Sequence, residues 1–135
     1  PDLFKLVIFM HPFLDVMNTM LNDQLPLTTG EYEEWGNPND SIYFHYMKSY
    51  SPYDNIIAQD YPNILIYGGL RDQQVYYWEQ AKMAAKLRAL KTDDNTLMLK
   101  IAADAGHNGF SSIMDDYLED AFKQAYILSL FGIKR

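Results

Sequence analysis

The sequence predicts an α/β fold with a mainly parallel sheet flanked by helices, and three observations support this prediction. Short, mostly apolar runs that suit buried strands lie at residues 5–10, 63–67 and 96–102. Helical patterns follow the second and third runs, and this alternation is typical of a parallel sheet. Finally, Asp72 and His107 each come a few residues after such a run, at the sheet edge where open α/β folds place their chemistry.

The first half of the chain contains one predicted strand and a long excursion. The strand, Lys5 to Met10, is stopped by His11-Pro12. Residues Leu14 to Leu21 suit one or two helical turns. Several prolines and glycines interrupt residues 24–61, which are therefore expected to be mainly irregular, with one helix from Asp40 to Tyr50.

The second half alternates regularly between strands and helices. The strand Asn63 to Tyr67 leads into Gly68-Gly69, and a helix is expected from about Trp78 to Leu90. A strand from Thr96 to Ala102 and a helix from Ser112 to Phe131 complete the pattern, with Gly132 as the stop. The apolar residues at helical spacing are Trp78, Met83, Leu87 and Leu90 in the first helix, and Ile113, Tyr117, Leu118, Ala121, Ala125 and Leu128 in the second.

Composition excludes several classes of function. A chain of 135 residues that is 48% hydrophobic suits one globular domain, and no apolar run approaches the ~20 residues of a membrane span. The net charge of −7 argues against binding to nucleic acids or anionic membranes and favours cationic ligands. The absence of cysteine excludes disulfides and thiolate metal sites. Together with the lack of a signal-like start, it fits a cytoplasmic location, with the periplasm as the alternative.

An aspartate followed by a histidine after successive strands is the order of the last two members of a hydrolase triad. The first member, a serine on a Gly-x-Ser-x-Gly turn, would precede the acid in the chain. Residues 1–135 contain no serine flanked in this way. The segment therefore indicates a chemistry that it does not complete by itself.

Three segments make the sequence resemble a known family. They are PFLDV at residues 12–16, PLTTGEYEEWGNP at residues 26–38 and YSPYDNI at residues 50–56. These resemble the C-terminal part of the oligopeptidase B (protease II) group of the prolyl oligopeptidase family of serine peptidases. The resemblance implies that residues 1–135 are the C-terminal portion of an α/β-hydrolase catalytic domain. The family's β-propeller and its nucleophilic serine would lie outside this segment, the serine just before Pro1.

The resemblance also implies roles for individual residues. His107 would be the general base and then the general acid, with Asp72 orienting its ring. Glu31 and Glu33 match the acidic positions that recognise an Arg or Lys side chain before the scissile bond, and two carboxylates bind one cation more strongly than one does. Phe13 matches an aromatic residue that packs on the same side chain.

One position departs from the family pattern. Many relatives carry an arginine two positions after the triad aspartate, and this chain has Gln74 there. An amide donates hydrogen bonds but has no charge, so we expect weaker binding of the substrate backbone at this position. The substrates would be short basic peptides, and neither a cofactor nor a metal ion is expected.

Other interpretations of the same residues differ in class. The acidic loop at residues 31–34 would also suit a non-catalytic module that binds cationic peptides. Another serine hydrolase of this fold, such as a dipeptidyl or acylaminoacyl peptidase, is a further alternative, although the pair of glutamates argues against it. His11 is interpreted as a strand-end residue and His45 as part of an aromatic cluster with its neighbours, not as metal ligands. The apolar edge at Lys5 to Met10 predicts that the isolated segment dimerises or aggregates without the rest of the peptidase.

Overall fold

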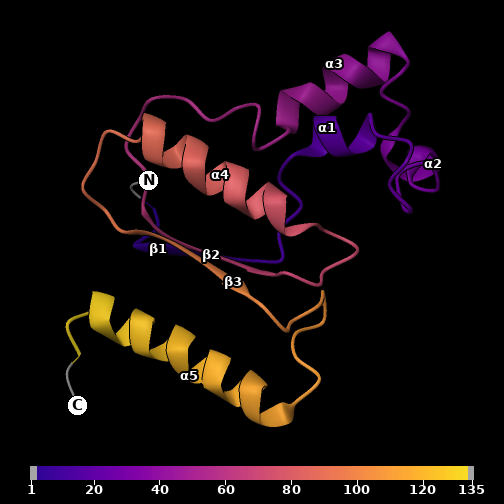
Figure 1. The fold of residues 1–135 in the computed structure, drawn as a ribbon. Helices are drawn as coiled ribbons and strands as arrows, with labels where there is room; N and C mark the ends of the chain where they lie inside the picture. The colour runs from indigo at the N-terminus through magenta and orange to yellow at the C-terminus, as the bar shows by residue number, and fades with distance from the viewer. Residues whose placement is uncertain (1–2, 134–135) are drawn as a thin grey trace.

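The computed structural model describes residues 3–133, which form a parallel sheet with one long helix on each face (Figure 1). The strands are β1 (Leu6–Met10), β2 (Asn63–Gly69) and β3 (Leu97–Ala102), in the order β1-β2-β3 and all parallel. Helix α4 (Tyr77–Leu90) lies over one face and helix α5 (Ile113–Leu130) over the other. The predicted α/β class and the order of these elements are confirmed.

The central strand β2 forms the middle of the core because it is hydrogen-bonded on both edges and buried along its whole length. Ile64 and Ile66 of β2 pack against Met83 and Leu87 of α4. Burial of each such side chain contributes about 1.5–3 kcal/mol, so this contact fixes α4 on the sheet. Among residues 3–133, no strand pairs with the outer edge of β1. The predicted self-association through that edge stays a prediction.

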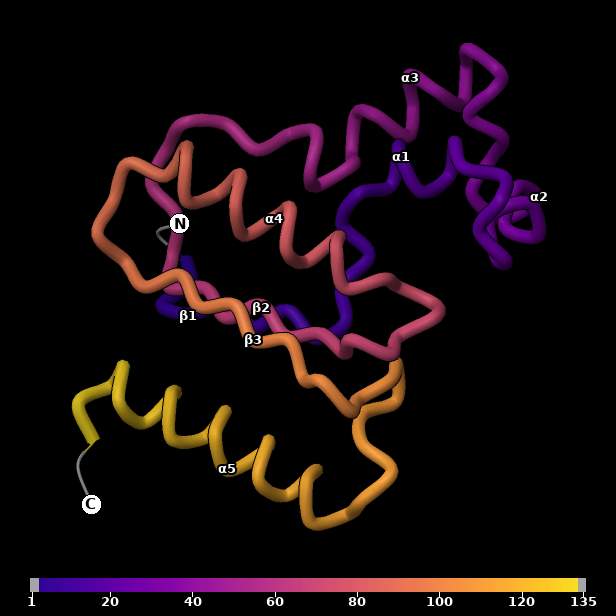
Figure 2. The backbone as a smooth tube through the Cα atoms, in the orientation of Figure 1, coloured from indigo at the N-terminus to yellow at the C-terminus, as the bar shows by residue number. Residues whose placement is uncertain are grey.

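Three short helices form a second cluster beyond the start of α4 (Figure 2). They are α1 (Val16–Met20), α2 (Tyr32–Trp35) and α3 (Ser41–Tyr50). Asp15 and Asp40 cap α1 and α3 by accepting backbone N–H groups. Methionines from α1 and α3 meet in a small core that includes Met17 and Met47. Helix α3 confirms the prediction at residues 40–50, whereas α2 was not predicted because one helical turn shows no periodicity.

The predicted apolar faces of the two long helices are confirmed only in part, since Met83 and Leu87 of α4 are buried but Trp78 is not. Trp78 is 39% exposed and stacks on Tyr76, because α4 turns Glu79 to the interior instead. The stripe on α5 that contains Tyr117 is also exposed. On the sheet side of this helix, Lys100 of β3 forms an ion pair of 2.6 Å with a glutamate of α5. Within residues 3–133, no helix combines the length and apolar character needed to cross a membrane.

Candidate active site

Three strand ends bring chemically active side chains together at the carboxyl edge of the sheet. His11 directly follows β1, Asp72 follows β2 by three residues and His107 follows β3 by five. Asp72 Oδ2 lies 2.9 Å from Nδ1 of His107 and 3.0 Å from Nδ1 of His11. The expected proximity of Asp72 and His107 is therefore present, and His11, interpreted from the sequence only as a strand-end residue, joins them.

The environment of Asp72 keeps its carboxylate ionised. Its Oδ1 atom accepts the backbone N–H groups of Gln74 and Val75, each at 2.9 Å. Burial by itself raises the pKa of Asp72, but the hydrogen bonds from Val75, from the His107 ring and from the two remaining donors favour the anion more strongly, and the net pKa is below its ordinary value. An ionised carboxylate can only accept hydrogen bonds, so each imidazole must donate from Nδ1. This leaves Nε2 of His107 as the basic nitrogen.

Backbone contacts fix the two loops that carry Asp72 and His107 to each other. Arg71 donates its N–H to the carbonyl of Ala105 at 3.0 Å. A Cβ atom at Gly69 would lie 2.3 Å from that carbonyl oxygen, so only glycine permits the approach. Gly106 and Gly109 exchange backbone hydrogen bonds and close a tight loop around His107, with a φ of +92° at Gly109. These backbone contacts therefore fix the loop that carries Asp72 relative to the loop that carries His107.

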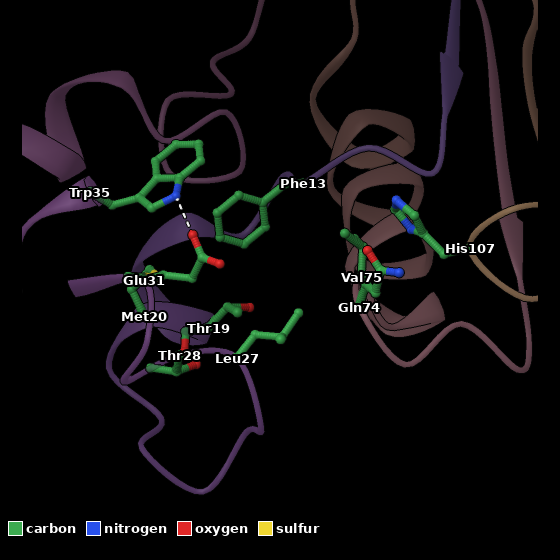
Figure 3. Close-up of a pocket in the computed structure, with 10 residues that line it drawn as sticks. All are labelled: Phe13, Thr19, Met20, Leu27, Thr28, Glu31, Trp35, Gln74, Val75 and His107. Atoms are coloured by element: carbon green, nitrogen blue, oxygen red, sulfur yellow. Dashed lines mark hydrogen bonds between the residues drawn. The ribbon is translucent and has the colours of Figure 1, made fainter. Parts of the chain in front are cut away.

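A cavity of about 220 Å³ extends from His107 toward the cluster of short helices (Figure 3). At the far end, Trp35 donates its indole N–H to Glu31 Oε2 at 2.9 Å, and its ring meets Phe13 edge to face. The cavity wall is mostly apolar with one carboxylate, from Glu31. The lining residues are Phe13, Thr19, Met20, Leu27, Thr28, Glu31, Trp35, Gln74, Val75 and His107.

Most, but not all, of the substrate residues predicted from the sequence line this cavity. Phe13, Glu31 and Gln74 do so, and Gln74 also donates its backbone N–H to Asp72. Glu33 does not line it and is exposed on α2. The reason is geometric: Glu31 stands at the cap of a helix, and residues two apart near a helix point in different directions. The substrate role of Glu33 stays a prediction.

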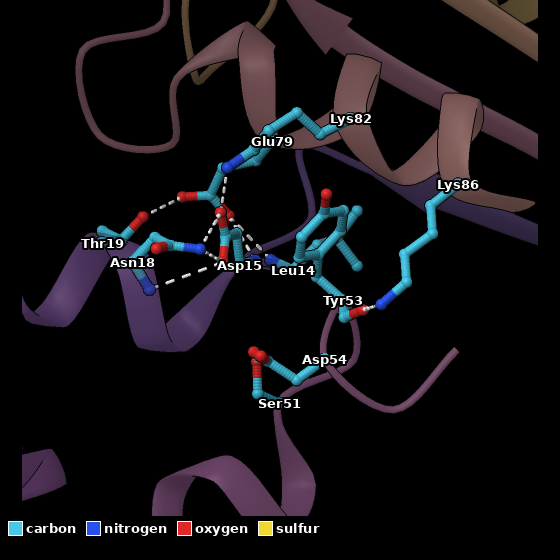
Figure 4. A network of polar contacts seen from close by, with 10 residues as sticks. All are labelled: Leu14, Asp15, Asn18, Thr19, Ser51, Tyr53, Asp54, Glu79, Lys82 and Lys86. Atoms are coloured by element: carbon cyan, nitrogen blue, oxygen red, sulfur yellow. Dashed lines mark hydrogen bonds and ion pairs between the residues drawn. The ribbon is translucent and has the colours of Figure 1, made fainter. Parts of the chain in front are cut away.

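A buried network behind the cavity wall was missed by the sequence reasoning (Figure 4). Glu79 is 1% exposed, and its carboxylate accepts the backbone N–H groups of Leu14 and Asp15 at 2.8 and 3.0 Å. It also accepts the hydroxyl of Thr19 at 2.7 Å. Lys82 forms an ion pair with Asp15 in the same network. Glu79 therefore holds the segment that carries Phe13 into the cavity.

The ligand atoms of His11, Asp72 and His107 lie within 4.8 Å of one another. Both Nδ1 atoms already contact the same oxygen of Asp72 at hydrogen-bond distance. We therefore interpret the cluster as a hydrogen-bonded acid–base group.

Comparison with known proteins places the chain in a family. Residues 1–134 match the prolyl oligopeptidase family, Peptidase_S9. Protease 2 of Moraxella lacunata is 47% identical over 98% of this chain and 19% of its own length, and dipeptidyl aminopeptidase BI of Pseudoxanthomonas mexicana is 43% identical over 98% and 18%. The structure of oligopeptidase B from Leishmania major aligns with a TM-score of 0.95 at 48% identity, over 100% of this chain and 19% of that one.

The chain spans about a fifth of the length of these relatives. The similarity covers the sheet edge, both loops and the cavity wall described above. The chain belongs to the prolyl oligopeptidase family, and its fold is that of the corresponding part of an α/β-hydrolase domain.

Proposed function

We propose that this chain is the part of an oligopeptidase B-type serine peptidase that supplies the triad acid Asp72 and the triad base His107. The supporting observation is the 2.9 Å contact between His107 Nδ1 and Asp72 Oδ2, at the mouth of a cavity with a carboxylate at its far end. The nucleophilic serine would come from a part of the peptidase outside residues 1–135.

In the proposed mechanism, His107 first accepts a proton and then donates it. Its Nε2 atom removes the proton from the serine hydroxyl as the serine oxygen attacks the peptide carbonyl, and it then donates that proton to the leaving amine. Asp72 stabilises the imidazolium formed in between and holds the ring in the tautomer with Nδ1–H. Water then releases the acyl group by the same route, with His107 again as base.

The cavity supports selectivity for Arg or Lys before the scissile bond. A peptide bond placed at His107 would direct the preceding side chain along the apolar wall toward Glu31. A hydrogen bond of 2.9 Å from Trp35 fixes the Glu31 carboxylate, and the Phe13 ring lies beside the Trp35 ring. In a site of low polarity, a guanidinium or ammonium group binds such a carboxylate more strongly than it would in water.

The similarity to dipeptidyl aminopeptidase BI favours one alternative function. A carboxylate at Glu31 could bind the free α-ammonium group of a substrate instead of a basic side chain. Two fluorogenic peptides distinguish these functions, one with a blocked N-terminus and Arg before the reporter, the other with a free N-terminal dipeptide lacking basic residues. Preference for the first supports the endopeptidase, and preference for the second supports the aminopeptidase.

We expect that Glu31→Gln in the complete peptidase raises KM for Arg substrates by about 10- to 100-fold, because one charge-assisted hydrogen bond is lost. Glu33→Gln tests the predicted partner, and the double variant tests whether both face one cation. Steady-state kinetics of the three variants provide the measurement. The control is Glu34→Gln, an exposed neighbour on α2 that should behave as wild type. If kcat and KM are unchanged in all variants, the acidic segment is a solvated surface and not a substrate site.

A second expected result separates the enzyme from a module that only binds cationic peptides. A serine-directed fluorophosphonate should label the complete peptidase once per molecule and should leave the isolated chain of residues 1–135 unlabelled. Mass spectrometry would locate the label. Labelling of any serine within residues 1–135, or no labelling of the complete protein, would contradict the proposed function.

A further inference from the structure

His11 has an unusual backbone conformation for a residue at the end of a strand. Its φ of +45° makes it the one non-glycine residue with positive φ among residues 3–133. The left-handed conformation costs roughly 1–2 kcal/mol for most residues. The sheet maintains it, because the His11 N–H donates to the carbonyl of Tyr67 at 2.9 Å. The strained backbone directs the imidazole, whose side chain is 9% exposed, onto Asp72.

The two histidines share one oxygen of one carboxylate. Nδ1 of His11 lies 3.0 Å and Nδ1 of His107 lies 2.9 Å from Oδ2 of Asp72, while Oδ1 is bound to backbone N–H groups. The ring centroids are 5.5 Å apart. The negative charge that would stabilise a protonated His107 is therefore divided between two donors.

We propose that His11 is a positioning residue that acts through Asp72 and sets the pH at which His107 becomes available as a base. This inference rests on the proposed function, in which His107 is the triad base. A hydrogen bond from neutral His11 weakens the pull of Asp72 on a proton at His107. Without that hydrogen bond, the full charge of Asp72 would hold a proton on His107 more strongly.

Other charged groups near the two rings are the same in every His11 variant. Glu31 lines the substrate cavity with His107, and a second cavity of about 350 Å³ contains both histidines. Burial raises the pKa of Tyr67 to about 12, aided by the charges of two acidic residues of α5, so this phenol stays neutral in the assay range. A difference between variants therefore reports on His11. The titratable residues in the second cavity, besides the two histidines, are Tyr67, Asp116, Glu119, Asp120 and Lys123.

The test compares two substitutions that differ in one hydrogen bond. His11→Asn keeps an N–H donor at the position of Nδ1 and tolerates the left-handed backbone, whereas His11→Leu has a similar size and no donor. In the complete peptidase, the acid limb of the pH profile of kcat/KM should move up by about 0.5–1 pH unit in His11→Leu. It should stay within about 0.2 unit of wild type in His11→Asn, by the same reasoning. The exposed His45, changed to Asn, is the control and should leave the profile in place.

An NMR titration of ¹³Cε1-labelled histidine gives the same comparison without enzymatic turnover. The midpoint assigned to His107 should rise in His11→Leu and not in His11→Asn. If His11→Leu does not fold, His11→Gly removes the donor and also relieves the backbone strain. The proposal is wrong if the donor-free variant leaves the midpoint in place, or if the Asn variant shifts it equally. A wild-type protein without peptidase activity would contradict the proposed function, and the NMR comparison would still decide the role of His11.

Discussion

Replacement of Asp72 by Asn should lower kcat of the complete peptidase by about 10⁴-fold with little change in folding. Oδ1 of Asp72 accepts two backbone N–H groups, so the amide oxygen of an asparagine must occupy that position. The amide NH₂ group would then face His107 and force its Nδ1 to accept. The ring proton would move to Nε2, where the serine hydroxyl needs a base. The variant loses both the negative charge and the productive tautomer.

Kinetics and circular dichroism of this variant should be measured beside Asp104→Asn. Asp104 is a matched control because it forms an ion pair of 2.6 Å with Arg71 in the same pair of loops and its side chain is 70% exposed. An exposed ion pair contributes little, so this control should keep its activity within about twofold. If Asp72→Asn retains a tenth or more of wild-type kcat in a folded protein, Asp72 is not the residue that orients the base.

Replacement of Glu79 by Leu should destabilise the protein by about 3–5 kcal/mol. The leucine would leave two backbone N–H groups and the Thr19 hydroxyl without the carboxylate that now accepts them. Such buried unpaired groups cost about 1–3 kcal/mol each. Glu79→Gln keeps one acceptor oxygen and should be less damaging. Because the same contacts fix the segment with Phe13, KM for Arg substrates should rise in both variants.

Denaturant unfolding monitored by tryptophan fluorescence would measure this loss, with Glu34→Leu as an exposed control on α2. The order of stability should be wild type, then Glu79→Gln, then Glu79→Leu. A Glu79→Leu variant within about 0.5 kcal/mol of wild type, the range of ordinary surface substitutions, would show that the network does not support the fold.

Sequence patterns predicted the parts of this structure that depend on local composition. Strands β1, β2 and β3 could be predicted because each is a short apolar run that ends at turn residues. The rule that parallel strands present their carboxyl ends at one edge then brought Asp72 and His107 together. The same rule applied to the end of β1 would have added His11. The place of His11 at the end of a predicted strand is therefore the sequence signal that identifies it.

Features that depend on distant partners could not be predicted in this way. Glu79 lies in the first turn of α4, where an acidic residue is ordinarily solvated. Its backbone partner Leu14 is 65 positions earlier in the chain, so no local pattern marks it as buried. Glu33 was expected beside Glu31 in one loop. The two residues instead lie at the start of helix α2, where side chains two positions apart point in different directions. The apolar stripe on α5 follows helical spacing, yet spacing does not say which face meets the sheet.

The close approach of Gly69 to Ala105 has a consequence for how selectivity could change. It joins the loop that carries Asp72 to the loop that carries His107, and the backbone contacts between these loops involve no residue of the short helices. Glu31, the carboxylate proposed to set selectivity, stands instead at the N-cap of α2, in the cluster of α1, α2 and α3, which Glu79 ties to α4. Under the proposed function, substitutions within residues 13–35 would alter which side chain the cavity accepts and would leave the contact between Asp72 and His107 in place. Such a division would let one peptidase site acquire several substrate preferences through changes in a single segment.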